Sequence, residues 1–105
     1  MVSALEDKKA EDIVLIDLQG VAIFTDYFVI CSGTSDRMIR SLVHAANDAM
    51  AESYGLKGKI VGSPSNGWIA VDFGDIVLHV FSPQQRSYYQ LEELWSSGKT
   101  LLKVK

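Results

Sequence analysis

The chain has 105 residues and a formal net charge of −3, with 48% hydrophobic and 22% charged side chains. These proportions are ordinary for a soluble globular protein, and the length suits one self-sufficient domain over residues 1–105. The Lys and Arg residues are scattered along the chain. This argues against direct, sequence-specific binding of nucleic acid, because phosphate recognition draws on clustered cations. A mildly acidic domain is better suited to a basic protein partner.

The sequence contains no signal for a membrane or for secretion. No apolar run approaches the roughly 18 residues that a membrane span needs. Residues 1–10 carry charges where a signal peptide requires an apolar stretch. The lone Cys31 excludes an internal disulfide. We therefore expect a cytoplasmic protein that makes no membrane contact.

Two strands and a helix are predicted in the first half of the chain. Residues 1–12 are polar and are expected to be the end of a helix that starts before Met1. The runs 13–18 and 27–31 are almost continuously apolar, which is typical of strands buried on both faces. Apolar residues then recur at helical spacing over 39–53, with N-cap candidates at 34–36 and Gly55 placed to end the helix.

The stretch 67–81 predicts a β-hairpin, because two runs rich in β-branched and aromatic residues flank a turn dipeptide at 74–75. Period-2 alternation then fixes which residues face each other. The predicted pairs are Phe73 with Ile76, Val71 with Leu78, Ile69 with Val80, Trp68 with Phe81, Ala70 with His79, and Asp72 with Val77. The first three pairs form an apolar side, and the other three form a mixed side. A mixed aromatic and polar surface suits protein binding, but a helix that covers this side explains the pattern equally well.

The remaining segments complete an α/β (α+β) fold. Residues 60–61 are a short strand candidate, 62–67 are a loop by composition, and Pro83 can occupy the first turn of a helix that runs to Trp95. Tyr89 and Trp95 are expected on the buried side of this helix, and no element is assigned to the tail after residue 98. The order of elements predicts a mixed sheet of about five strands with helices packed on it.

Few residues could carry chemistry. The run Gly33-Thr34-Ser35 lies at a strand-to-helix junction and could cradle a phosphate. A nucleotidyltransferase also needs two or three carboxylates on neighbouring strands to hold metal, and Asp72 and Asp75, separated across a turn, do not supply them. We expect Thr34 and Ser35 to cap the helix. A nucleotide-binding or nucleotidyltransferase-like enzyme is the alternative function.

Cysteine and histidine offer no stronger candidate. Cys31 ends a buried-type strand, where cysteine usually behaves as a small hydrophobe. One cysteine and two histidines, His44 and His79, cannot form a structural zinc site. We therefore expect no catalytic residue, no metal and no cofactor.

A family resemblance rests on five segments of the chain. They are residues 4–13, 25–37, 67–68, 72–81 and 88–95, which include TDYFVICSGTSDR, DFGDIVLHVF and YYQLEELW. Together, in this order and spacing, they closely resemble the Iojap-like ribosomal silencing factors over nearly the whole chain up to Trp95. The resemblance implies a fold related to nucleotidyltransferases that lacks their catalytic carboxylates.

The resemblance also implies a function. Members of the family bind large-subunit ribosomal protein fourteen, a basic protein at the subunit interface, and sterically prevent the small subunit from joining. Translation is thereby repressed when nutrients are scarce, and organellar relatives assist assembly of the large subunit. The expected partner is the large ribosomal subunit, and the expected role is that of a ribosomal silencing factor and not of an enzyme.

Six residues are predicted to make the contact with the partner: Trp68, Asp72, Phe73, Asp75, His79 and Tyr88. Trp68 matches the family position most expected there. Phe73 is expected to be only partly covered by the core, so that both side chains would act as apolar anchors. Asp72 and Asp75 would meet lysines or arginines of the partner. His79 would lie at the flank, although a hydrogen-bonded core histidine is the commoner case for such a residue. A homodimer that uses the mixed side of the hairpin is a further alternative.

Overall fold

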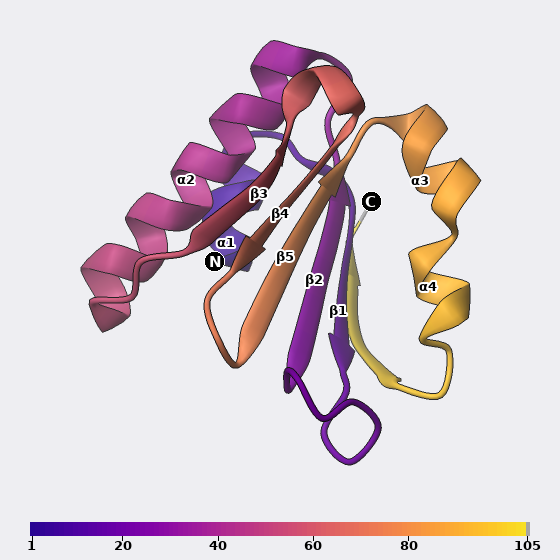
Figure 1. Ribbon diagram of the computed structural model, residues 1–105. Coiled ribbons are helices and arrows are strands. Elements are labelled where there is room, and N and C mark those ends of the chain that lie inside the picture. The colour runs from indigo at the N-terminus through magenta and orange to yellow at the C-terminus, as the bar shows by residue number, and fades with distance from the viewer. Residues whose placement is uncertain (105) are drawn as a thin grey trace.

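A six-stranded mixed sheet is the central element of the computed structural model, which describes residues 1–104 (Figure 1). The strands are β1 (Glu11–Asp17), β2 (Tyr27–Ser32), β3 (Lys59–Ser63), β4 (Trp68–Asp72), β5 (Ile76–Phe81) and β6 (Lys99–Val104). Their spatial order is β3-β4-β5-β2-β1-β6. Strands β2 and β5 run parallel, and the other neighbouring pairs run antiparallel. The predicted α+β class with a mixed sheet is confirmed.

Helices cover both faces of this sheet (Figure 1). Helices α1 (Val2–Asp7) and α2 (Asp36–Tyr54) pack on one face, and α3 (Pro83–Tyr89) and α4 (Leu91–Leu94) pack on the other. A short 3₁₀ turn, η1 (Pro64–Asn66), links β3 to β4. Each face has its own buried apolar cluster. No helix within residues 1–104 is long and apolar enough to cross a membrane.

The long helix α2 begins and ends at the predicted caps. The Ser35 hydroxyl accepts a hydrogen bond from the Met38 backbone N–H at 3.1 Å, and this satisfies one of the free N–H groups of the first turn. Gly55 takes a left-handed conformation with φ 65° at the other end. The apolar side of α2 packs on the sheet through Ile39, Leu42, Val43, Ala46 and Met50.

The β4–β5 hairpin has the predicted register. Five of the six predicted pairs are strand partners, and the Phe73 N–H donates to the Ile76 carbonyl at 2.9 Å to close the turn. Gly74 takes φ 93° in this turn, a conformation that other residues rarely adopt. The apolar side of the hairpin joins the core beneath α2, and the mixed side faces α3 and α4.

Three features depart from the predicted pattern. The tail forms a sixth strand, β6, which pairs with β1. Almost all residues of β6 are exposed, so its sequence lacks the apolar alternation of a half-buried strand. The helix predicted from Pro83 to Trp95 is broken, because Gln90 takes φ 47° and ψ 48°. The polar segment 1–12 is part helix and part strand, since α1 ends at Asp7 and β1 begins at Glu11.

Candidate partner-binding surface

Trp68 begins β4 at a point where two parts of the backbone approach closely. Gly67 before it has φ 73°, and a Cβ on Gly67 would lie 2.7 Å from Gln85 Cγ and 2.8 Å from Ser82 Oγ. The Ser82 N–H also donates to the Gly67 carbonyl at 2.8 Å. Glycine at 67 therefore allows the start of α3 to pack against the start of β4.

Aromatic rings hold Trp68 in place on the side that faces α3. The indole stacks on Phe81 with 4.9 Å between ring centroids, and the Tyr89 ring centroid lies 4.6 Å from that of the indole. Phe81 is fully buried, Trp68 is half-buried and Tyr89 is 46% exposed. The indole is thus fixed by packing on one part of its surface and open on another.

A groove of about 360 Å³ lies beside Trp68, and we call it the Trp68 groove. Its lining residues are Val61, Gly62, Asn66, Trp68, Ala70 and Tyr89. Val61 pairs with Ala70 across the β3–β4 ladder and is 56% exposed, so α3 and α4 leave this part of the sheet open. A concave apolar and aromatic surface of this kind suits the side chains of a protein partner.

His79 lies beneath Trp68 and not at the flank of an exposed patch. The Trp68 Nε1–H donates to His79 Nδ1 at 3.1 Å, and His79 is only 7% exposed. Burial lowers the pKa of His79 to about 4, so its ring is neutral at pH 7. His79 is therefore the hydrogen-bonded core histidine that the sequence analysis left open, because α4 and the aromatic rings close over this half of the mixed side.

Phe73 lies on the opposite face of the sheet, in the core beneath α2. It is 7% exposed, so the prediction that the core covers it only partly is wrong. The chain that follows α2 closes over the ring, since a Cβ on Gly58 would lie 2.8 Å from Phe73 Cε1. Phe73 therefore adds nothing to the lining of the Trp68 groove.

The two predicted carboxylates lie exposed at the far end of the hairpin. Asp72 Oδ1 accepts a hydrogen bond from the Gly74 N–H at 2.8 Å, which stabilises the turn. The Asp75 carbonyl accepts one from Thr25 Oγ1 at 2.9 Å, which ties the turn to the loop between β1 and β2. Asp72 is the last residue of β4 and Trp68 the first, so the two residues are roughly 13 Å apart along the strand.

The structure groups Trp68 with Tyr88, Tyr89 and the buried His79, and separates it from Asp72, Phe73 and Asp75. Tyr88 is 78% exposed as expected, and its ring lies edge-to-face with Tyr89 at 5.1 Å. Tyr89 and Val61 line the groove. Tyr89 was expected on the buried side of the last helix but is 46% exposed, and the sequence pattern does not single out Val61. For Val61 the period-2 alternation of β3 is a usable signal once β3 is paired with β4. The exposure of Tyr89 depends on the break between α3 and α4 at Gln90, and no clear sequence signal predicts that break.

At the alternative phosphate-binding site, Gly33-Thr34-Ser35, polar groups already make hydrogen bonds within the protein. The Gly33 N–H donates to the Phe81 carbonyl at 2.9 Å, and Ser35 caps α2. Burial raises the pKa of the Cys31 thiol to about 12, which disfavours a reactive thiolate. Within residues 1–104, no three His, Cys, Asp or Glu side chains group closely enough to hold a metal ion.

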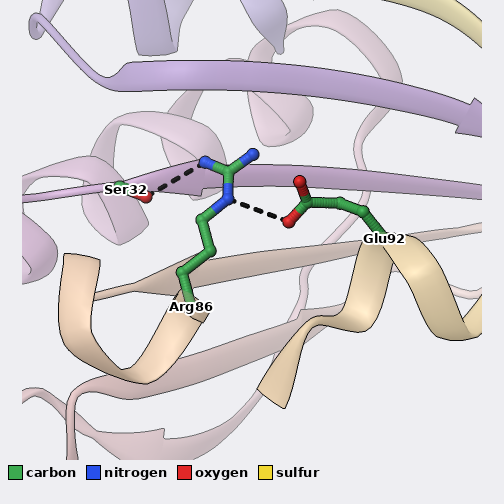
Figure 2. A network of polar contacts seen from close by, with 3 residues as sticks. All are labelled: Ser32, Arg86 and Glu92. Atoms are coloured by element: carbon green, nitrogen blue, oxygen red, sulfur yellow. Dashed lines mark hydrogen bonds and ion pairs between the residues drawn. The ribbon is translucent and has the colours of Figure 1, made fainter. Parts of the chain in front are cut away.

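A polar cluster joins α3 and α4 to the end of β2 (Figure 2). Arg86 Nε donates to Glu92 Oε1 at 2.9 Å, and Arg86 Nη1 donates to Ser32 Oγ at 3.0 Å. The Arg86 side chain is only 12% exposed, so these contacts are partly shielded from water and are stronger than at a free surface. The cluster fastens the two short helices, which the break at Gln90 separates, to the sheet.

The fold and this surface define a small α+β domain whose distinctive feature is an aromatic groove beside the end of a hairpin. A family model described as ribosomal silencing factor during starvation matches residues 1–105. The chain belongs to this family, which confirms the resemblance to the Iojap-like ribosomal silencing factors.

Relatives are similar over most of this chain. The ribosomal silencing factor RsfS of Bacillus subtilis (strain 168) is 41% identical over 96 residues, which are 91% of this chain and 81% of that protein. The Mus musculus protein named mitochondrial assembly of ribosomal large subunit protein 1 is 37% identical over 102 residues, with 91% of this chain and 43% of that protein covered. A crystal structure of a Chromobacterium violaceum protein has a TM-score of 0.85 at 30% identity, covering 99% of this chain and 86% of that one.

Proposed function

We propose that this chain binds the large ribosomal subunit through ribosomal protein fourteen and sterically blocks the association of the ribosomal subunits, which represses translation under nutrient limitation. Membership of the ribosomal silencing factor family supports the role. The name of the Mus musculus relative, which refers to assembly of the large subunit, supports that subunit as the partner. A protein with this role works where translation takes place, in the cytoplasm.

The observation that carries the proposal is the state of Trp68. Its indole is half-buried and fixed by Phe81 and Tyr89, while it borders an open apolar groove of about 360 Å³. Tryptophan and tyrosine in such a setting are the residue types that dominate binding energy at protein interfaces. We therefore assign Trp68, Tyr88 and Tyr89 as the aromatic part of the contact.

Charge supports the choice of a basic partner. The chain carries a net charge of −3, and the exposed carboxylates Asp72 and Asp75 lie at the far end of the hairpin whose first residue is Trp68. Acidic groups at the rim of an apolar contact favour a basic partner and speed the encounter. The buried side chains of Phe73 and His79 are not assigned a direct contact.

Blocking of the subunits needs no chemical step in this proposal. The domain measures 35 × 33 × 23 Å, so a bound copy fills space that a small subunit would have to enter. We propose neither a catalytic residue nor a cofactor. The enzyme alternative expects heat when nucleoside triphosphate and magnesium are added, which calorimetry measures directly.

Cosedimentation with isolated large subunits tests the proposal. We expect the protein to pellet with large subunits and to remain there when small subunits are added, with few joined ribosomes formed. Absence of the protein from the large-subunit fraction at saturating concentration would overturn the proposal. Sedimentation of the free protein decides whether a homodimer competes, since a dimer that uses the Trp68 groove should separate when large subunits are added.

A further inference from the structure

We propose that His79 is a positioning residue, which holds the Trp68 indole in the orientation in which it meets the partner. This inference rests on the proposed function, because it takes Trp68 as the anchor of the contact. The contact between the two side chains is direct: the Trp68 Nε1–H donates to His79 Nδ1 at 3.1 Å. His79 itself is only 7% exposed.

The hydrogen bond defines the state of the imidazole. An Nδ1 atom that accepts a hydrogen bond carries no proton, so the neutral ring has its proton on Nε2. The depressed pKa of His79, about 4, agrees with a neutral ring. The rings of Phe28 and Phe81 lie near it, with centroids at 4.6 Å and 6.2 Å from that of the imidazole. These neighbours are apolar and offer the imidazole neither a hydrogen-bond acceptor nor a charge.

Core packing alone does not account for a histidine here. His79 Nε2 is buried and has no hydrogen-bond partner among residues 1–104, and a buried unpaired N–H is destabilising. A phenylalanine or leucine at this position would avoid that penalty. The feature that the imidazole supplies and phenylalanine or leucine would lack is an acceptor for the Trp68 N–H.

A fixed indole makes binding tighter because less freedom is lost when the partner docks. Immobilising one rotamer-rich side chain at an interface lowers affinity by roughly three- to tenfold. We expect a loss of that size in His79→Phe, which keeps a ring of similar size and removes the acceptor. His79→Asn places an amide oxygen near the position of Nδ1, so it should recover most of the affinity.

The indole N–H signals test the positioning without any ribosome. The chain has two tryptophans, and the variant Trp95→Phe assigns the Trp68 signal by NMR. We expect the Trp68 indole proton to exchange slowly with water in the wild type, faster in His79→Phe and slowly again in His79→Asn. If His79→Phe does not give a folded spectrum, His79→Leu serves as the variant without an acceptor. Equal exchange rates in the wild type and the variant without an acceptor would overturn the proposal.

A double-mutant cycle, in which the affinity for large subunits is measured, completes the test. In a Trp68→Phe background, His79→Phe should change affinity by less than about twofold, because the two substitutions remove the same interaction. A loss that persists in full in this background would mean that His79 acts through the fold in general, which contradicts the positioning role. If the wild type does not bind large subunits at all, the proposed function fails, while the exchange rates still decide whether His79 holds the indole.

Discussion

At the scale of single residues, Trp68 combines a buried part with a surface that a partner can reach. Phe81 and Tyr89 contact its ring, and His79 accepts its N–H. The open part borders the Trp68 groove, which no charged side chain among residues 1–104 lines. A large ring that is held before binding loses little freedom when a partner docks, which is the property of a strong anchor.

Truncation of Trp68 should therefore weaken binding strongly. We expect Trp68→Ala to lower the affinity for large subunits roughly thirtyfold, which corresponds to about 2 kcal/mol. Leu101→Ala is a control, because Leu101 is another exposed hydrophobic residue, 46% accessible, on β6 at the sheet edge opposite to β3 and away from the hairpin. Quantitative cosedimentation of both variants, with circular dichroism as a check of folding, measures the effect. Normal binding by a folded Trp68→Ala protein would refute the role of Trp68.

His79 makes stability depend on pH. Burial lowers the pKa of the folded-state imidazole from 6.5 to about 4. Between these two pH values the imidazole binds a proton in the unfolded chain but not in the folded chain. The contribution of His79 to stability is complete above pH 6.5 and is lost progressively down to pH 4. The loss is on the order of 3 kcal/mol, at about 1.4 kcal/mol per pH unit.

Urea unfolding of the wild type and His79→Phe at pH 4 to 7.5 isolates this contribution from that of the carboxylates, which are common to both proteins. We expect the free energy of unfolding of the variant to rise relative to that of the wild type as the pH falls. A difference between the two proteins that stays constant over this range would show that His79 titrates normally.

At the scale of elements, segments with a strong local pattern are the ones that the sequence predicts. The β4–β5 register follows from alternation and a glycine turn, and α2 follows from helical spacing with Ser35 and Gly55 as caps. Strand β6 is missed because it lies at the sheet edge with little burial, so it has no alternation to detect. The break at Gln90 is missed because a non-glycine residue takes a left-handed conformation there.

For the candidate site, too, features with a local sequence pattern are predicted and features that depend on tertiary packing are missed. Trp68 is predicted as a contact residue from the family resemblance, and its place at the start of the hairpin follows from the strand register. The exposure of the residues on the mixed side around Trp68 depends on where α3 and α4 lie, and no local sequence pattern predicts the position of these helices. The burial of His79 therefore stays open at the level of sequence. Phe73, on the opposite face, was expected to be partly covered but is buried by the chain after α2.

The cluster around Arg86 fastens α3 and α4 to the sheet and so shapes the mixed face. Arg86→Met keeps an apolar stem but leaves the Ser32 hydroxyl and the Glu92 carboxylate without their donor. We expect it to lower the free energy of unfolding by about 2 kcal/mol, in the range for hydrogen bonds to charged groups. Urea denaturation measures the change.

Glu92→Gln is the control for this prediction, because the amide oxygen can still accept from Arg86 Nε. Its effect should stay below about 1 kcal/mol, as for a partly exposed ion pair. If Arg86→Met proves as stable as the wild type, packing and not this cluster holds the helices.

At the scale of the whole molecule, size, charge and one aromatic surface suffice for the proposed role. The domain offers a rigid sheet covered on both faces, with one part of a face left open beside Trp68. A net charge of −3 favours a basic partner over nucleic acid. A bound domain of 35 × 33 × 23 Å is large enough to act as an obstacle between two macromolecular surfaces.

Subunit joining in vitro tests this obstacle role most directly. Purified large and small subunits are mixed with increasing amounts of the protein, and light scattering follows the formation of joined ribosomes. We expect the wild type and Leu101→Ala to suppress joining at saturation, and Trp68→Ala to require roughly thirtyfold more protein. Joining to the normal extent in the presence of saturating wild-type protein would contradict the proposed function.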